Sequence, residues 1–193
     1  MTAVMKLLKS LRAGAAFEDR LRPQLSRLHR LAWRLTGSEA EADDLLQEAL
    51  MRAWARRIEF HDLDSPGPWL ARVLYHTWMD LQRERGLPAS EASFENSSPI
   101  PATSFVNDDE RLLAVEPAVL ERALRDLPPV QRAVLLMHDG EGYSLEHTAD
   151  TIEAPTEVVK SHLYHAREVL RDRLRDGSIS TRAPTRTPER DLT

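Results

Sequence analysis

The sequence predicts an all-α protein made of two small helical domains joined by a flexible linker. Apolar residues recur at spacings of three and four across residues 17–86 and 116–176, and no run of alternating β-branched residues indicates a strand. Residues 88–109 hold three prolines and five serines with almost no helical periodicity, a composition typical of a linker. We therefore divide the chain into an amphipathic N-terminal extension (1–16), a first domain (17–86), a linker (87–115), a second domain (116–176) and a disordered tail (177–193).

The first domain opens with a helix that has a complete apolar stripe and a clear stop signal. Gly37 suits the left-handed residue that follows many helices, and Ser38 with Glu41 predicts a capping box at the start of the next helix. The stripe consists of Leu25, Leu28, Leu31, Ala32 and Leu35.

The next helix is predicted to run to about Arg57, followed by a loop over residues 58–68 and a third helix from Trp69 to about Arg85. The loop, IEFHDLDSPGP, places Phe60 and His61 at an exposed position between the two helices. The predicted inward faces are Ala42, Leu46, Ala49, Leu50 and Ala53 on the earlier helix, and Leu70, Val73, Leu74, Trp78 and Leu81 on the later one.

Four short helices are predicted in the second domain, with proline and glycine between them. Pro128 and Pro129 stop the first and start the second, the run Asp139 to Gly142 forms a turn, and Ser144 is an N-cap for a helix ending near Ile152. A longer last helix follows Pro155. Two helices joined by a tight turn, the second one longer, indicate a helix-turn-helix.

Composition excludes several classes of protein. No cysteine is present, so disulfides, thiolate zinc sites and cysteine nucleophiles are ruled out. Lys6, Lys9 and Arg12 interrupt the apolar stretch of the first 16 residues, so we expect neither an export signal nor membrane insertion, and we predict a cytoplasmic protein. Because no phosphate loop, nucleophile elbow or metal-ligand motif occurs, we expect no enzyme activity, no cofactor and no metal.

Three acidic residues form one stripe on the helix after Ser38. Glu41, Asp44 and Glu48 stand at i, i+3 and i+7, a spacing that lines up carboxylates for an arginine-rich helix of a partner. The alternative is a solvated face whose first acids complement the helix dipole.

The last helix carries a basic and aromatic stripe beside its buried side. Its buried residues are predicted to be Val159, Leu163, Ala166, Leu170 and Leu174, and the stripe consists of Lys160, Tyr164, Arg167 and Arg171. On the second helix of a helix-turn-helix, such a stripe contacts DNA phosphates and, near its start, base edges. The alternative is an amphipathic helix whose arginines pair with Glu168 and Asp172. The net charge of the whole chain is −5, so any DNA binding depends on local basic faces.

These motifs, in this order, resemble the extracytoplasmic-function (ECF) group of sigma-70 transcription initiation factors. ADDLLQEALMRAW (42–54) is similar to the segment that binds core RNA polymerase, and PWLARVLYHTWMDLQRER (68–85) to the helix that melts the promoter and recognises the minus-ten element. LRDLPPVQRAVLLMHDGEGYSLEHTAD (124–150) with PTEVVKSHLYHAR (155–167) is similar to region 4, which reads the minus-thirty-five element. Glu153 stands where the family often has a turn glycine, and Glu157 and His162 make this region 4 less basic than usual.

The resemblance implies a factor that binds core RNA polymerase through its beta-prime and beta subunits and directs it to promoters, in a stress or envelope response, with an anti-sigma protein as a possible further partner. The implied polymerase-binding residues are Glu41, Asp43, Asp44, Gln47 and Glu48. The implied minus-ten contacts are Phe60, His61, Arg72, His76, Met79 and Arg83, and the implied minus-thirty-five contacts are Glu157, Lys160, Ser161, Tyr164, Arg167 and Arg171. The main alternatives from other classes are a stand-alone helix-turn-helix regulator and a helical adaptor that binds only protein.

Overall fold

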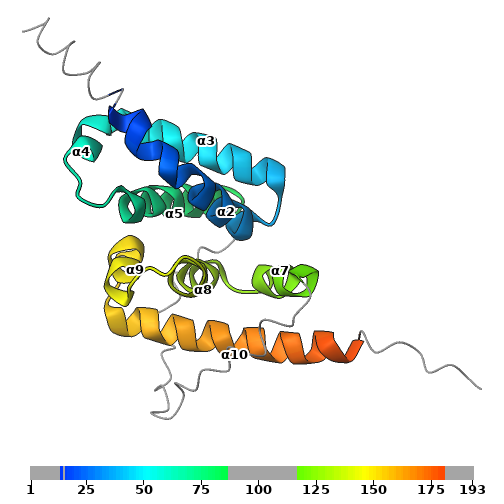
Figure 1. The fold of residues 1–193 in the computed structure, drawn as a ribbon. Coiled ribbons are helices and arrows are strands. Elements are labelled where there is room, and N and C mark those ends of the chain that lie inside the picture. Colours follow the sequence, from blue (N-terminus) through cyan, green and yellow to red (C-terminus); the bar gives the residue numbers. More distant parts are fainter. Residues whose placement is uncertain (1–13, 15, 87–116, 181–193) are drawn as a thin grey trace, which may run out of the picture.

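The computed structural model describes residue 14, residues 16–86 and residues 117–180, with side chains up to residue 174. The described part contains helices and no strand, and it forms two helical units (Figure 1), so the predicted fold class is confirmed. Residues 16–21 are helical and lead into η1 (Arg22–Gln24); the rest of the first unit is α2 (Leu25–Thr36), α3 (Glu39–Ala55), α4 (Arg57–His61) and α5 (Pro66–Glu84). The second unit is α7 (Pro117–Arg125), α8 (Pro129–Leu135), the π-helical turn η3 (Leu136–Gly140), α9 (Leu145–Ile152) and α10 (Thr156–Ser180).

The end of α2 forms as predicted, but the cap of α3 does not. Gly37 adopts φ 74° and donates its N–H to the Trp33 carbonyl at 2.7 Å. The predicted capping box is wrong, because Ser38 accepts no capping hydrogen bond. Instead the hydroxyl of Thr36 accepts the Ser38 N–H at 3.4 Å and lies 3.0 Å from the Ala32 carbonyl, to which it donates. A threonine at the end of α2 therefore ties the turn together.

Helix α3 presents a slightly different face to the core from the one predicted. Leu45 is fully buried, whereas Leu46 and Leu50 are only partly buried and lie at the edge of the core. The buried face consists of Ala42, Leu45, Ala49 and Ala53. This small rotation leaves apolar side chains on the surface of α3.

The segment predicted as a loop over residues 58–68 is mostly helical. Helix α4 occupies its first part, and α5 begins at Pro66 rather than at Trp69, with the proline in the first turn, where its missing N–H has no intrahelical partner. Helix α5 buries Leu70, Leu74 and Trp78 as predicted, with Val73 and Leu81 packed at the margin.

The second unit follows the predicted order of helices. The Ser144 hydroxyl accepts the His147 N–H at 3.1 Å, which confirms the predicted N-cap of α9. Glu153 ends α9 in the left-handed conformation with φ 57°. All five residues predicted to be buried on α10 are buried, and the helix extends to Ser180, four residues into the segment predicted as a tail. The predicted linker, the tail beyond Ser180 and residues 1–13 lie outside the described residues.

The two units are packed against each other. Helices α7, α8 and α9 form a middle layer between α10 on one side and α2 with α5 on the other (Figure 1). Helix α5 packs on α9, and α2 packs on α7 and η3. The described helices include none that is long and apolar enough to cross a membrane.

Candidate functional site

All five residues predicted to bind polymerase lie on the solvent side of α3. Asp43, Asp44 and Gln47 are exposed, and the side chains of Glu41 and Glu48 are about 40% exposed (41% and 40%). The predicted acidic stripe of Glu41, Asp44 and Glu48 therefore exists as a surface.

Two members of the acidic stripe are bound to basic residues of the same unit. Glu41 pairs with Arg85 at 3.2 Å, and Glu48 pairs with Arg52 at 2.9 Å. Arg52 also donates to Asp80 at 2.7 Å, and its hydrogen bonds to Asp80 and Glu48 raise the pKa of the Arg52 guanidinium. A partner's cations would have to compete with these arginines at Glu41 and Glu48.

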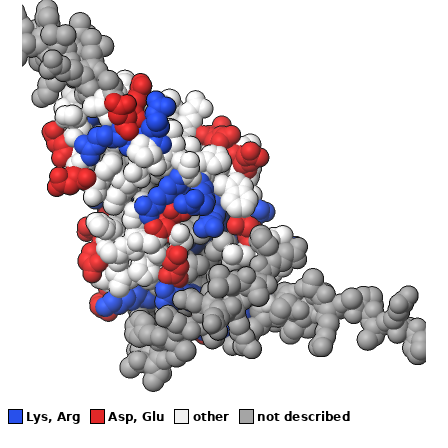
Figure 2. Space-filling view, in the orientation of Figure 1, with Lys and Arg blue, Asp and Glu red and all other residues white. Residues whose placement is uncertain are grey.

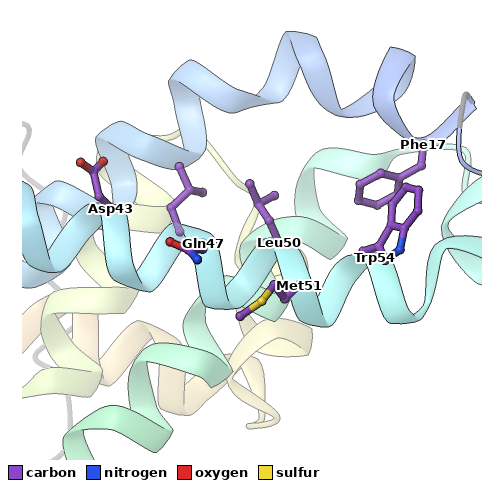
Figure 3. A pocket seen from close by; sticks show the side chains of 7 residues that line it. Phe17, Asp43, Gln47, Leu50, Met51 and Trp54 are labelled. Atoms are coloured by element: carbon purple, nitrogen blue, oxygen red, sulfur yellow. The ribbon is translucent and has the colours of Figure 1, made fainter.

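An open apolar groove lies along α3 (Figure 3). Met51 and Trp54 are 54% and 42% exposed, and Ile58 further along the chain is 48% exposed. The ring of Phe17 meets Trp54 edge-on with centroids 5.4 Å apart and closes one end of the groove. The groove is lined by Phe17, Asp43, Leu46, Gln47, Leu50, Met51 and Trp54.

The sequence interpretation missed this groove because it assigned Leu46 and Leu50 to the core. The signal was available: Met51 and Trp54 are large apolar residues that lie three apart and outside the predicted buried face. Asp43 and Gln47, predicted to bind polymerase, line the groove. Helix α3 therefore offers both an apolar groove and carboxylates, which suits an amphipathic basic helix.

The structure contradicts the prediction that Phe60 is exposed for contact with DNA. Phe60 is 0% exposed; its ring lies 4.7 Å from that of Phe17 and 5.4 Å from that of Trp69, centroid to centroid. Helix α4 turns the aromatic side chain into the core, and Arg20 covers it, with its guanidinium 5.5 Å from the ring centroid. Neighbouring His61 is exposed as predicted.

The predicted minus-ten face of α5 is partly exposed and partly occupied. Met79 is only 4% exposed and packs in the core, so the prediction that it contacts DNA is wrong. The side chains of Arg72 and Arg83 are 44% and 59% exposed, and each holds a carboxylate: Arg72 donates to Glu153 at 2.6 Å and Arg83 to Asp80 at 2.8 Å.

His76 lies between these arginines on α5. Its Nε2 is 3.6 Å from a Glu153 oxygen, too far for a hydrogen bond. Burial lowers the pKa of His76, and the nearby Glu153 carboxylate opposes that shift only in part. Neutral His76 is therefore favoured more than in water.

The basic stripe of α10 lies on the surface, but each of its cations is already paired. Lys160 binds Glu157 at 2.7 Å, Arg167 binds Asp139 in a two-pronged contact at 2.6 and 2.9 Å, and Arg171 binds Glu168. The predicted alternative of arginines paired along the helix thus holds for Arg171, whereas Arg167 reaches back to η3.

Two further residues of α10 differ in their surroundings. Ser161, predicted to contact bases, is only 7% exposed, because it lies on the side of α10 that faces the second unit's core; that prediction is wrong. Tyr164 is partly exposed and stacks edge-on with His165 at 5.4 Å. Among the described residues no group of three metal-ligating side chains occurs.

Comparisons with known proteins cover both units. The family models of sigma-70 region 2 and sigma-70 region 4 match residues 21–87 and 118–170. The ECF RNA polymerase sigma factor SigE of Mycolicibacterium smegmatis is 32% identical over 93% of this chain and 70% of its own length. The RNA polymerase sigma-E factor of Streptomyces coelicolor is 31% identical over 86% of this chain and 90% of its own. The sigma factor RpoE, solved in complex with the anti-sigma factor NepR from Bartonella quintana, is 25% identical and superimposes with a TM-score of 0.64, over 82% of this chain and 96% of that one.

Proposed function

The chain belongs to the extracytoplasmic-function group of the sigma-70 family, and from this premise we propose how its residues divide the work of promoter-specific initiation. The chain is a sigma factor that binds core RNA polymerase and directs it to promoters. We assign polymerase binding and the minus-ten element to residues 17–86, and the minus-thirty-five element to residues 116–176. All of these roles are binding roles without a covalent step, and they place the protein in the cytoplasm with polymerase. By analogy with the RpoE–NepR complex, an anti-sigma protein is a further partner class.

The polymerase surface is the side of α3 that carries the acidic stripe and the groove. The observation that supports this assignment is the exposure of Met51 and Trp54 in a groove that Asp43 also lines, because large apolar side chains at an open groove favour a protein partner. Asp43 and Gln47 would position that partner by polar contacts from within the groove, and the acids would steer a basic helix of the beta-prime subunit into it.

The minus-ten surface, after the corrections above, consists of His61, Arg72, His76 and Arg83. These side chains lie on α4 and the polar side of α5, and the guanidinium groups of Arg72 and Arg83 suit a phosphate backbone. Phe60 and Met79 support this surface from beneath, since both are core residues.

The minus-thirty-five surface is the start of α10 and its basic stripe. Glu157 is exposed and at the first turn, where its carboxylate suits a cytosine amino group. Lys160, Tyr164, Arg167 and Arg171 follow along the helix toward the phosphates. Because the three cations are paired with acids in the free chain, binding DNA exchanges one partner for another.

The test is binding of purified core polymerase by a charge-reversed α3. Asp44→Lys with Glu48→Lys replaces two carboxylates by cations facing a basic partner, and we expect at least a tenfold loss of affinity, about 1.4 kcal/mol. The matched control is Asp62→Lys with Asp64→Lys, the same change of charge at two exposed positions of the same unit away from α3. Unchanged polymerase binding by a helical Asp44/Glu48 variant contradicts the assignment, and loss in both variants points to a nonspecific charge effect.

A second variant tests the groove separately from the charges. Trp54→Ala removes the largest exposed apolar side chain of α3, and Ile58→Ala removes a comparably exposed one that does not line the groove. We expect Trp54→Ala to weaken polymerase binding and Ile58→Ala to leave it within a factor of two. Equal effects would remove the groove from the interface.

A further inference from the structure

Arg20 ties the segment between α4 and α5 to the start of the first unit. Its guanidinium donates one N–H to the His61 carbonyl and another to the Leu63 carbonyl, across 41 and 43 residues of sequence. The same group lies 5.5 Å from the centroid of the buried Phe60 ring. One side chain of the helical residues 16–21 thus holds two main-chain groups of a distant segment.

The carbonyl end of α4 is suited to such a partner. Its last residue is His61, and the final carbonyls of a helix have no partner within the helix. The amides of Asp62 and Leu63 donate to carbonyls three residues earlier at 3.2 and 3.4 Å, both longer than the usual distance of about 2.9–3.0 Å. Arginine side chains can satisfy carbonyls at a helix C-terminus, so Arg20 supplies from outside what α4 lacks.

The segment that follows α4 lies mostly in solvent. Residues 61–65 are exposed except for Leu63, whose side chain packs against the margin of the core. Ser65 is the N-cap of α5, but its side chain makes no capping hydrogen bond. The path of residues 61–65 therefore depends largely on Arg20 and on the side chain of Leu63.

The contact uses the fork of the guanidinium group. The two terminal nitrogens of Arg20 each donate to a different carbonyl, and these carbonyls belong to residues two apart. A lysine ammonium presents a single nitrogen on a flexible stem and cannot reproduce that geometry. Because both terminal nitrogens are engaged with the main chain, the contact favours a role in holding the segment over a role in binding a DNA phosphate directly.

His61 is the functional residue that depends on this arrangement. It is one of the four residues that we assign to the minus-ten surface, and its carbonyl is one of the two that Arg20 holds. Acidic as well as basic side chains lie on the surface of the first unit around α4 (Figure 2). Attraction of DNA at long range is therefore weak there, and a contact between His61 and DNA depends on where the main chain places the imidazole ring.

We propose that Arg20 is a positioning residue of the minus-ten surface, which fixes His61 by holding the carbonyls at the end of α4 and does not itself contact DNA. The proposal rests on the proposed function for the role of His61, whereas the tie between Arg20 and residues 61–63 is a contact within the first unit. Without the tie, residues 61–65 occupy several arrangements. The apparent dissociation constant for DNA then rises in inverse proportion to the fraction of molecules that hold His61 in place.

Hydrogen exchange of the full chain tests the tie without polymerase or DNA. In Arg20→Met we expect the amides of Asp62 and Leu63 to exchange roughly tenfold faster, while the amides in the middle of α3 and α5 keep their protection. Arg20→Lys should behave like Arg20→Met, because the ammonium group cannot span the two carbonyls. Arg22→Met is the matched control, since it removes the same charge from an exposed position two residues away.

Binding of DNA by the reconstituted holoenzyme tests the role of the tie. The probe is a fluorescent single-stranded oligonucleotide that carries the minus-ten element of a promoter at which this holoenzyme initiates. We expect about fivefold weaker binding with Arg20→Met and with Arg20→Lys, as for a tied fraction of about one fifth, and a change within a factor of two with Arg22→Met. The logarithmic salt slope should stay at the parent value, because no phosphate contact is lost.

A double-mutant cycle connects Arg20 with His61. Because Arg20 acts through His61, combining Arg20→Met with His61→Ala should weaken binding no more than His61→Ala alone. Losses that multiply in the double variant would show that Arg20 acts through the general stability of the unit, and would contradict the proposal.

The remaining outcomes separate the tie from the proposed function. Unchanged exchange at Asp62 and Leu63 in an Arg20→Met protein with normal circular dichroism overturns the tie, whatever the holoenzyme binds. Parent affinity with Arg20→Lys, or a salt slope smaller by about 0.7 with Arg20→Met, would indicate a direct phosphate contact instead. Parent affinity with His61→Ala removes His61 from the minus-ten surface and removes this role of Arg20 with it, and the exchange data alone then decide whether the tie exists.

Discussion

Replacing Phe60 by alanine distinguishes a structural role of α4 from a direct role in holding DNA. The side chain is fully buried between Phe17 and Trp69, so the substitution leaves a cavity that these rings cannot easily fill. Such Phe→Ala changes destabilise proteins by about 3–5 kcal/mol. A unit of about 70 residues has a stability of roughly 4–10 kcal/mol, so the variant loses about half of it.

The assay is thermal unfolding followed by promoter binding at low temperature. At about 4–8 °C per kcal/mol for a domain of this size, we expect the melting temperature to fall by roughly 12–40 °C. At a temperature where the variant is folded, closed and open promoter complexes should be reduced in equal proportion. His61→Ala, at the exposed neighbour, should change stability by less than about 0.5 kcal/mol. A Phe60→Ala protein that melts normally and fails only in forming the open complex would refute the packing argument.

Two further predictions concern pH and salt. Burial lowers the pKa of His76 and of His162, and the nearby His165 lowers the pKa of His162 further. Below about pH 6.5 the folded chain therefore binds fewer protons than the unfolded chain, and the free energy of unfolding decreases as the pH falls. We expect a lower melting temperature at pH 5.5 than at pH 7.5 and a smaller difference in His162→Gln; a flat profile in the parent chain contradicts this. For a minus-thirty-five duplex, we expect the free chain to bind weakly with a logarithmic salt slope of about −3 to −4, because few phosphate contacts are available. Nanomolar binding at physiological salt would instead favour a stand-alone regulator.

Periodicity was sufficient to predict the helices because most of them have one apolar face and a proline or glycine at an end. Gly37, Pro129 and Ser144 each occupy the helix boundary that the sequence indicated. Prediction failed where several faces were apolar. On α3, Leu45, Leu46 and Leu50 all compete for the core, and only packing against α2 and α5 decides that Leu45 is buried.

Contacts between residues distant in the sequence were beyond prediction from one sequence. Phe60 lies in a charged segment, so the sequence alone predicts that it is exposed. In the fold it is buried against Phe17 and Trp69. The pairing of Arg27 with Glu141 joins positions 114 residues apart, and no local pattern indicates which acid an arginine on α2 will meet. All five residues predicted to bind polymerase lie on the surface as expected, because their exposure depends on a single helix.

From the charges of the second unit and of α10, we expect this domain to depend on the rest of the assembly for binding to the minus-thirty-five element. Residues 116–176 contain eight basic and twelve acidic residues, so attraction to DNA at long range is absent. At short range, Lys160, Arg167 and Arg171 each give up a carboxylate before they hold a phosphate, which leaves only a small net gain in free energy. A weak contact suffices once polymerase and the first unit are on the promoter, because a linker of this length keeps the second unit at an effective concentration on the order of millimolar. Low intrinsic affinity then has a consequence for selectivity: the second unit contributes to binding only where the first is already placed, so isolated matches to the minus-thirty-five element do not retain the free chain.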